Sequence, residues 1–268
     1  MNIDETAERL LAALDGGHTI AAPSRQADDF ELPAAFAVAD ALRRLRIARG
    51  ERPCGYKIGF TNRSIWQRYG VHAPIWGPVW DNTVRQLEGT TAQVSLAGLC
   101  QPRLEPEVVF GFAHTPRAGM SLDELQGCLS WVAHGFEIVH THFDGWRFTA
   151  ADTVADFALH GRLFIGPHVA TADWPDMARD LAQMQVQLHR DGQLQDSGQG
   201  AVVLDGPLNA LRLWVDAMAL HTAAWRIEPG DVVTTGTITD AWPLSAGESW
   251  TTALTENRLH GLTLTTLP

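Results

Sequence analysis

The chain is 268 residues long, with 45% hydrophobic residues, 19% charged residues and a formal net charge of −11. This length is enough to bury a large core, and the acidic balance argues against nucleic acid as a partner, because phosphate contacts need a basic face. Apolar runs stay well short of the roughly 20 residues of a membrane helix, which argues against a membrane protein. The acidic N-terminus predicts no secretory signal, and three cysteines without CxxC spacing indicate a reducing compartment, so we expect a cytoplasmic enzyme.

Two amphipathic helices are predicted in the first part of the chain. Apolar residues recur at helical spacing over 3–15, and this pattern ends at a pair of glycines. The second pattern covers 33–49; it begins with a proline and stops before a glycine, as helices often do. We therefore expect a helical segment over 1–50 and a single compact catalytic domain over 51–268.

From Tyr56 onward, short β-like runs separated by turns replace the helical pattern. Two helices interrupt them: 121–133, which opens with an S-x-x-E capping box, and 207–220, which opens with a proline. The strands outnumber the helices and do not alternate with them, which favours an α+β fold with a curled sheet. The predicted strands cover 83–87, 93–96, 103–112, 136–143, 162–165, 183–189, 231–235 and 249–255.

Three glutamates lie in two of the predicted strands. Glu105 and Glu107 share one face of their strand, about 7 Å apart, and Pro106 between them predicts an edge or a bulge. Glu137 lies in an apolar strand where a lone carboxylate is costly. Three converging carboxylates would suit Mg²⁺ or Mn²⁺. The alternative is an exposed edge, with Glu137 paired to an arginine such as Arg103.

Two further features carry polar groups. Lys57, in GYKIGF, is the only lysine of the chain. Unlike arginine, lysine loses its proton when its surroundings demand it, so Lys57 is either a proton-transfer residue or a static ion-pair partner. The segment Thr235-Gly236-Thr237 ends a strand with an approachable backbone and hydroxyl donors. It is either a substrate-binding loop or an ordinary strand end rich in threonine.

Seven stretches in the same order resemble the hydratase/decarboxylase branch of the fumarylacetoacetate hydrolase superfamily, typified by 2-keto-4-pentenoate hydratases. The resemblance runs from about residue 20 to the C-terminus, and as an ordered set the stretches are highly specific. The stretches are GYKIGFTN, YGVHAPIWGPVWD, QPRLEPEVVFGF, FEIVHTHFDGW, DTVAD, DGPLNAL and GDVVTTGTITDAWPL.

The resemblance implies a fold, a cofactor and a set of roles. The fold would be a mixed β-roll with flanking helices, in a homodimer or higher homo-oligomer. Mg²⁺ or Mn²⁺ would be bound by the three glutamates, Lys57 would be the active-site lysine, and residues 235–237 would touch substrate. A lysine beside a divalent cation meets like-charge repulsion and partial desolvation, so we expect its pKa to be lowered.

Three positions depart from the hydratase pattern as the resemblance defines it. Ile75 stands where an aspartate is expected, Thr141-His142 replaces a Ser-Arg pair, and residues 156–160, DFALH, replace a DNASS-like segment. We expect all three near the substrate. Ile75, Trp76 and His142 are therefore candidate substrate contacts, and His160 is the candidate general base, since imidazole titrates near neutral pH.

His142 and His160 are each equally well interpreted as packing or capping residues. The remaining aromatic residues and histidines are assigned less specific roles. Trp66, Trp76, Trp80 and Trp146 are candidates for the cavity wall, with core packing as the alternative. The other histidines singled out are interpreted as structural or surface residues; they are His72, His114, His134, His140 and His221.

The leading interpretation is a metal-dependent hydratase that adds water to a 2-hydroxy-2,4-dienoate, or its 2-oxo-enoate tautomer, and yields a 4-hydroxy-2-oxo acid. Such an enzyme would belong to aromatic or related catabolism. Two alternatives use the same metal and lysine: decarboxylation of a 2-oxo-enedioate, and C–C bond hydrolysis of an acylpyruvate. A non-catalytic partner protein is a fourth possibility, against which the intact ligands and lysine argue.

Overall fold

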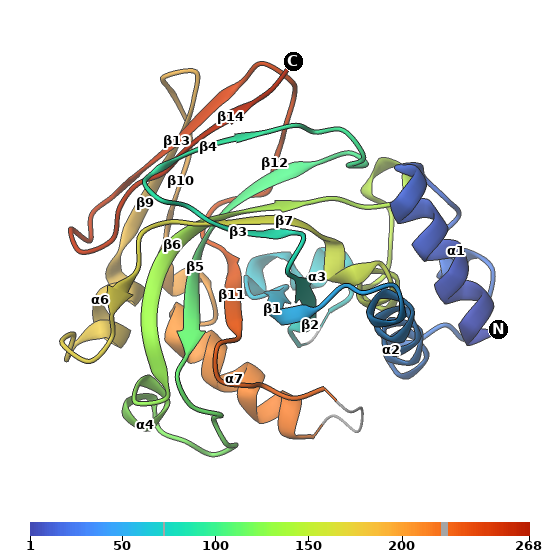
Figure 1. Cartoon of the computed structure of the whole chain (residues 1–268), viewed down its shortest axis with the longest axis horizontal. Helices are drawn as coiled ribbons and strands as arrows, with labels where there is room; N and C mark the ends of the chain where they lie inside the picture. Colours follow the sequence, from blue (N-terminus) through green and yellow to red (C-terminus); the bar gives the residue numbers. More distant parts are fainter. Residues whose placement is uncertain (72, 221–224) are drawn as a thin grey trace.

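The computed structural model describes residues 1–71, 73–220 and 225–268 (Figure 1). The two N-terminal helices form as predicted: α1 (Ile3–Gly16) is capped by the Asn2 side chain and ends at a left-handed Gly17, and α2 (Leu32–Ala48) follows it. They lie together at one side of the molecule in Figure 1. The other helices are α3 (Trp66–Tyr69), α4 (Leu122–Gln126), α5 (Ala150–Ala155), α6 (Met177–Gln183) and α7 (Pro207–Ala219).

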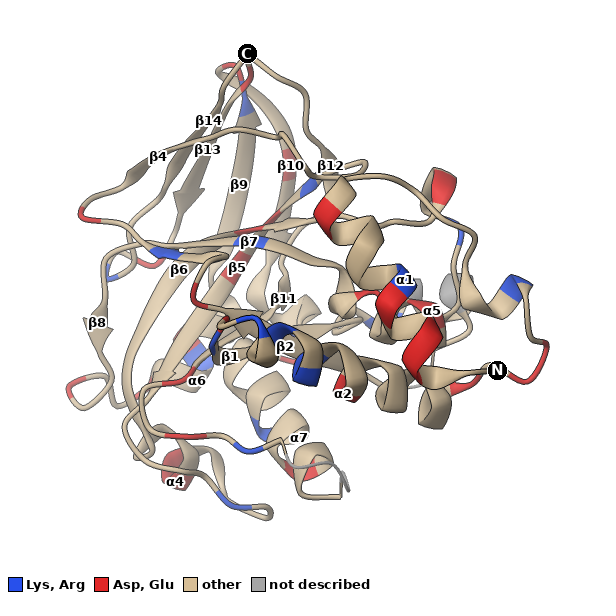
Figure 2. Cartoon of the chain, turned by 45° about the vertical axis from the view of Figure 1, so that its right-hand side comes forward, with Lys and Arg blue, Asp and Glu red and all other residues tan. Residues whose placement is uncertain are grey.

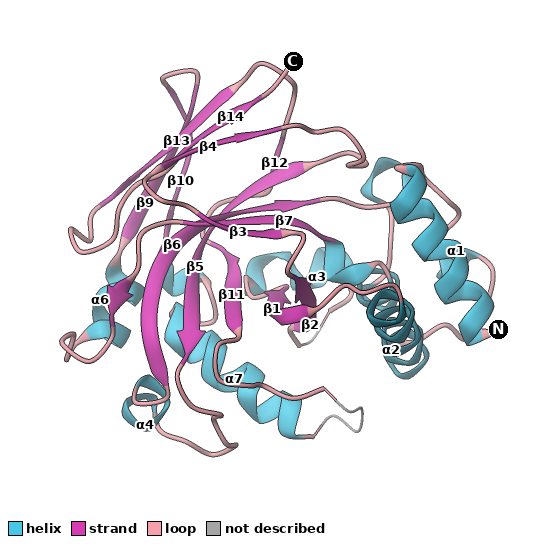
Figure 3. Cartoon of the chain, in the orientation of Figure 1, coloured by secondary structure: helices cyan, strands magenta, loops and turns pink. Residues whose placement is uncertain are grey.

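A large mixed sheet forms the centre of the molecule, and β5 and β6 lie in its middle (Figure 3). Most neighbours are antiparallel, but β1 pairs with β11 and β3 with β7 in parallel. The order is β2 (Ile75–Trp80), β1 (Pro53–Gly59), β11 (Val232–Thr237), β5 (Arg103–Phe112), β6 (Leu129–Val139), β7 (His160–Ile165) and β3 (Val84–Gln86), with β12 (Trp242–Pro243) paired to β5 and β8 (Val169–Ala170) to β6.

A second, smaller sheet covers one side of the first. Leu104, Phe136 and Ile138 of the β5–β6 pair are buried in one apolar cluster with Leu188 and Trp250 of the smaller sheet. This contact fixes which face of β5–β6 is left for polar side chains. The order in the smaller sheet is β10 (Gln193–Gln199), β9 (Gln185–Arg190), β13 (Ser249–Leu254), β14 (Thr263–Thr266) and β4 (Thr91–Val94).

The mixed, curled sheets with few helices confirm the α+β interpretation, but several predicted elements are wrong in detail. The capping box of Ser121 and Glu124 is present, yet its helix ends at Gln126, and residues from Leu129 join β6 because they pair with β5. Strand β2 and helices α5 and α6 were not predicted. Among the described residues no helix is long and apolar enough to cross a bilayer.

Pro106 does not mark an edge, because β5 lies between β6 and β11. The irregularity is in the neighbouring strand instead: the pairing of β11 with β5 skips from Thr234 to Thr237. This break frees the backbone of Gly236 from the strand ladder. It therefore brings the Thr-Gly-Thr segment directly against the glutamates.

Candidate active site

The three glutamates converge on one face of the β5–β6 pair. Glu105 lies directly opposite Glu137 in the register, and Glu107 lies two residues further along the same face. One carboxylate oxygen from each residue lies within 4.8 Å of the other two. Figure 2 shows these acidic positions of β5 in the middle of the large sheet, whereas many other acids lie on helices and loops at the periphery.

Glu107 is fully buried and held from β11. Its Oε2 accepts hydrogen bonds from the Thr234 hydroxyl and from the backbone N–H of Gly236, the latter at 2.6 Å. Gly236 has a φ of +104°, and a Cβ there would lie 1.8 Å from the Thr61 Oγ1, so only glycine fits. The other oxygen of Glu107, Oε1, is buried without a hydrogen-bond partner within the described part of the chain.

Glu137 is also fully buried and is held from two sides. Its Oε2 lies 3.2 Å from the Lys57 Nζ, and its Oε1 accepts from the His160 Nδ1 at 2.8 Å. The His160 Nε2 in turn lies 2.8 Å from the Thr83 hydroxyl. Both ring nitrogens of His160 are thus engaged within the protein.

Burial and mutual repulsion perturb the carboxylates. Burial, together with the neighbouring carboxylates, raises the pKa of Glu107 well above its usual range and that of Glu105 to about 7. Burial acts in the same direction on Glu137, but Lys57 and His160 outweigh it and its pKa is lowered. With all three carboxylates ionised, their charge would exceed that of the one ammonium group, and the Glu107 Oε1 has no hydrogen-bond partner in the described part of the chain. This donor set fits a hard divalent cation such as Mg²⁺ or Mn²⁺.

The pKa of Lys57 is raised in the structure. Burial lowers it, but the carboxylates of Glu137, Glu105 and Glu107 together outweigh burial. The lowered pKa expected from the sequence concerns the site with a cation bound, and it stays a prediction for that state.

The glutamate cluster opens onto a cavity of about 180 Å³. Lys57, Glu105, Gly236 and Thr237 line it. Arg103 and Trp146 line it too, and the Arg103 guanidinium lies 4.0 Å from the centre of the Trp146 ring. The rest of the wall mixes two kinds of residue: the apolar ones are Ile58, Phe60, Ile75, Val139, Phe148, Ala158, Leu159 and Ala241, and the polar ones include Thr61, Asn62, Thr239 and Asp240.

The candidate substrate contacts divide into two groups. Ile75, Gly236 and Thr237 line the cavity, as does Trp146. Thr235 does not, because its hydroxyl donates to the Val108 carbonyl at 3.0 Å within the sheet. The other candidates that do not line it are Trp66, Trp76 and Trp80; Trp76 packs on Phe36 of α2, with ring centres 4.9 Å apart.

His142 and His160 do not line the cavity either. His142 is completely buried, and its Nδ1 lies 2.5 Å from the Asp156 carboxylate, so it is held inside the protein. The position of His160 behind Glu137 argues against direct proton transfer to a water in the cavity. Among the histidines interpreted as structural, His134 and His140 are buried and His114 is exposed, whereas His72 and His221 lie outside the described residues.

Sequence reasoning did not identify two contributors to the site as such. Arg103 was considered only as an ion-pair partner of Glu137, although it lies two residues before Glu105, so the period of two that paired Glu105 with Glu107 predicts it on their face. Thr234, which holds Glu107, carried no comparable signal, because the skip in β11 decides which threonine meets the carboxylate.

Comparison with known proteins agrees with this geometry. No family model matches the chain. The chain is 31% identical over 248 residues to 2-hydroxyhexa-2,4-dienoate hydratase of Comamonas testosteroni, covering 92% of this chain and 91% of that protein. It is 28% identical over 255 residues to 4-oxalocrotonate decarboxylase of a Pseudomonas species, covering 93% of each.

A solved structure has the same fold. The 4-oxalocrotonate decarboxylase of Pseudomonas putida G7, complexed with magnesium and adipate, superposes with a TM-score of 0.88 at 23% identity, over 99% of this chain and 97% of that one. The chain therefore belongs to the hydratase/decarboxylase branch of the fumarylacetoacetate hydrolase superfamily.

Proposed function

We propose that this protein is a metal-dependent hydratase of aromatic or related catabolism, a hydro-lyase that adds water to a 2-hydroxy-2,4-dienoate or its 2-oxo-enoate tautomer and yields a 4-hydroxy-2-oxo acid. One observation carries the proposal: three carboxylates converge beside one buried lysine, at a cavity that Glu105 and the lysine line. The relative that is 31% identical, a 2-hydroxyhexa-2,4-dienoate hydratase, supports this substrate class.

Glu105, Glu107 and Glu137 would hold Mg²⁺ or Mn²⁺. When bound, such a cation supplies Lewis acidity towards the oxygens of a 2-oxo acid. Lys57, fixed 3.2 Å from Glu137 and lining the cavity, would move a proton to or from the substrate. Ile75 would pack against the carbon chain, and Thr237 would border the polar end of the substrate.

Decarboxylation of a 2-oxo-enedioate is the second candidate, and the decarboxylase relative at 28% identity supports it. Arg103 is the feature of the cavity that favours it, because a guanidinium in the cavity wall can pair with a second carboxylate. The apolar side chains of the wall, such as Ile75 and Phe148, favour an uncharged tail, and hence hydration. C–C hydrolysis of an acylpyruvate has no specific observation in its favour.

The proposal also covers the fold type, the domain bounds, the oligomeric state and the location in the cell. The curled mixed sheet is consistent with a β-roll, with 1–50 as a helical segment and 51–268 as one catalytic unit. The assembly would be a homodimer or a higher homo-oligomer. The three free cysteines, Cys54, Cys100 and Cys128, support a cytoplasmic location.

The test is turnover by the purified protein with Mg²⁺, using NMR to identify the products. The substrates would be 2-hydroxydienoates, 2-oxo-enedioates and acylpyruvates. A 4-hydroxy-2-oxo acid from the dienoate supports the proposal. Release of CO₂ from the enedioate, with no hydration of the dienoate, would replace it with the decarboxylase, and a pyruvate fragment would indicate the hydrolase.

A further inference from the structure

His160 occupies a position that neither the cavity nor the surface explains. It is buried, it does not line the cavity, and each of its ring nitrogens has one partner. Nδ1 lies 2.8 Å from the Glu137 Oε1, and Nε2 lies 2.8 Å from the Thr83 Oγ1. A carboxylate oxygen only accepts hydrogen bonds, so Nδ1 carries the proton and donates to Glu137.

We propose that His160 is a positioning residue for the metal site: it fixes the Glu137 carboxylate through the hydrogen-bonded chain Glu137–His160–Thr83. With Oε1 held by the imidazole, the carboxylate cannot rotate, and Oε2 stays directed at Lys57. Hydrogen bonds to a ligand from outside the coordination shell set its orientation and its affinity for a metal. The inference rests on the proposed metal site but not on the identity of the substrate.

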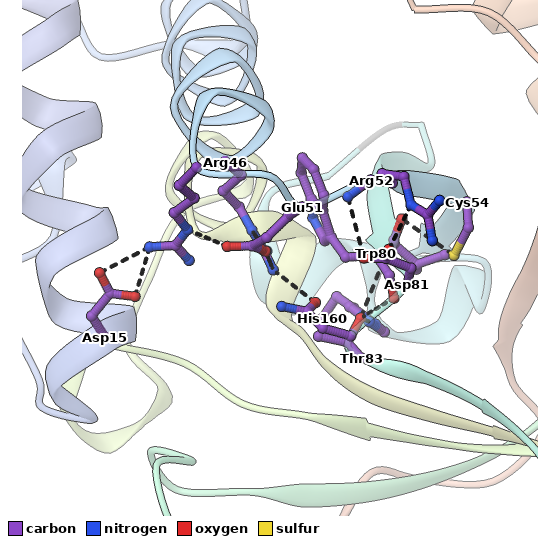
Figure 4. A network of polar contacts seen from close by, with 12 residues as sticks. Asp15, Arg46, Glu51, Arg52, Cys54, Trp80, Asp81, Thr83 and His160 are labelled. Atoms are coloured by element: carbon purple, nitrogen blue, oxygen red, sulfur yellow. Dashed lines mark hydrogen bonds and ion pairs between the residues drawn. The ribbon is translucent and has the colours of Figure 1, made fainter.

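The outer end of this chain of hydrogen bonds is firmly anchored. The Thr83 Oγ1 lies 3.2 Å from the Trp80 backbone N and 3.0 Å from its carbonyl O. The Trp80 ring lies under the guanidinium of Arg46, 4.2 Å from its centre, and the buried Arg46 pairs with Glu51. Figure 4 shows this network between helix α2 and the turn that carries Thr83. The imidazole therefore rests on a rigid support.

The backbone directly before His160 is strained, and this strained turn places the imidazole beside Glu137. Phe157, Ala158 and Leu159 all have left-handed φ values, of 56°, 52° and 63°, although none of them is glycine. Such conformations are strained and persist only where the surroundings impose them. Here the Asp156 carbonyl accepts from the Leu159 N–H at 2.7 Å, and the Leu159 carbonyl accepts from the His140 N–H at 2.9 Å. The turn brings Ala158 and Leu159 to the cavity wall and His160 behind Glu137.

Two substitutions of His160 test the contributions of its two ring nitrogens separately. His160→Asn places an amide N–H near the position of Nδ1. It therefore keeps the hydrogen bond to Glu137 and loses the contact with the Thr83 hydroxyl. His160→Gln places its amide near the position of Nε2. It therefore keeps the contact with the Thr83 hydroxyl and loses the hydrogen bond to Glu137. Both remove the imidazole and its packing, so both are expected to lower thermal stability by similar amounts.

The primary measurement is Mn²⁺ binding by the metal-free full-length protein, followed by calorimetry and by the EPR signal of free Mn²⁺. We expect His160→Gln to weaken binding by about 10- to 100-fold, and His160→Asn, which loses only the contact with Thr83, to weaken it only several-fold. His142→Gln is the matched control: it removes an equally buried histidine that donates to a carboxylate outside the cluster, so Mn²⁺ binding should not change.

Several outcomes would overturn the inference. They are equal Mn²⁺ affinity of the Asn and Gln variants, wild-type affinity of His160→Gln, or an equal loss in His142→Gln. Turnover with Mg²⁺ gives a further test, since His160→Asn cannot titrate: a general base would lose most of its turnover there, whereas a positioning residue would not.

If His160→Gln does not fold, Thr83 provides an independent test. Thr83→Val removes the hydroxyl at nearly constant shape and should weaken Mn²⁺ binding several-fold, and Thr83→Ser should restore it. Unchanged binding in Thr83→Val would contradict the role of the chain. A protein that binds Mn²⁺ as inferred but hydrates no dienoate would refute the proposed function alone, and a protein that binds no Mn²⁺ would refute both.

Discussion

The two faces of the β5–β6 strand pair both bury titratable side chains, but they treat the charge in opposite ways. One face, here called the metal face, carries Glu105, Glu107 and Glu137. The opposite face, here called the core face, carries His134 beside the apolar residues Val108 and Phe136. Both faces belong to the same backbone, so the difference lies in the side chains that meet each face.

On the core face, His134 is kept neutral. Burial lowers its pKa to about 4, and both ring nitrogens have partners: the Glu107 carbonyl at 2.9 Å and the Thr252 hydroxyl at 2.9 Å. On the metal face the negative charges exceed the local positive charge, and the Glu107 Oε1 has no partner within the described chain. An unsatisfied carboxylate oxygen within a cluster of acids is a donor that a divalent cation would bind.

Removing one charge from the metal face should have the largest effect. Glu107→Gln keeps an oxygen for Thr234 and Gly236 and places an amide where Oε1 lies. We expect Mn²⁺ affinity to fall by roughly 1000-fold, or about 4 kcal/mol, in calorimetric titrations. The metal-free variant should unfold at a higher temperature than wild type, because a buried like-charge repulsion is relieved.

Glu88→Gln provides the control for Glu107→Gln. It removes a glutamate charge from an exposed position outside the cluster, so neither Mn²⁺ affinity nor thermal stability should change appreciably. Equal Mn²⁺ affinity of Glu107→Gln and wild type would show that the metal face binds no cation.

Replacing Lys57, the ammonium group beside the metal face, should affect turnover more than metal binding. Lys57→Met removes a group that lies 3.2 Å from Glu137, and proton transfer by a positioned side chain contributes about 100- to 10,000-fold to a rate. We expect turnover of the dienoate to fall at least about 100-fold, with Mn²⁺ affinity retained. Lys57→Arg keeps the charge but cannot lose its proton, so it should not restore turnover. Near-normal turnover of Lys57→Arg would reduce Lys57 to an electrostatic partner.

The sequence predicted the metal face better than its surroundings. The period of two put Glu105 and Glu107 on one face, and the ordered motifs added Glu137 and Lys57. Whether those residues converge depends on the register of β5 with β6, which a sequence pattern does not reveal. Pro106 was predicted to mark an edge or a bulge in its own strand. The irregularity lies instead in the partner strand β11, whose pairing with β5 skips from Thr234 to Thr237.

Adjacent residues in a strand lie on opposite sides of it, so their roles can be predicted only once the strand itself has been assigned. Ile75 and Trp76 were both expected at the substrate, but they lie in β2, where consecutive side chains point to opposite sides. Ile75 therefore lines the cavity and Trp76 packs against α2. The placement of His160 was not predictable, because left-handed non-glycine residues at 157–159 carry no local signature.

A cavity on the core face should reduce stability and leave the metal site intact. Val108 is completely buried next to Glu107, with its side chain on the opposite side of β5. Val108→Ala removes two methyl groups, and we expect a loss of about 2 kcal/mol in the free energy of unfolding, measured by urea denaturation of the metal-free protein. Mn²⁺ affinity should match wild type. A large loss of affinity would mean that the two faces are not independent.

A smaller, pH-dependent effect should come from His140, just beyond the end of β6. Burial, with the neighbouring His142, lowers its pKa from 6.5 to about 3, so the folded protein keeps it neutral while the unfolded chain takes up a proton below about pH 6.5. The unfolded state then binds more protons, so the contribution of His140 to stability is complete above this pH and is lost as the pH falls towards 3. The slope is at most about 1.4 kcal/mol per pH unit.

His140→Asn tests this, because the amide oxygen can accept from the Cys100 N–H as Nδ1 does. Urea denaturation of the metal-free proteins between pH 4 and pH 7 should give a shallower loss of stability for His140→Asn than for wild type. His114→Asn, at an exposed position, should follow the wild-type slope. Parallel slopes for all three proteins would show that His140 is not held neutral. The acid sensitivity would then come from other groups whose pKa is lowered in the folded protein, such as Glu137.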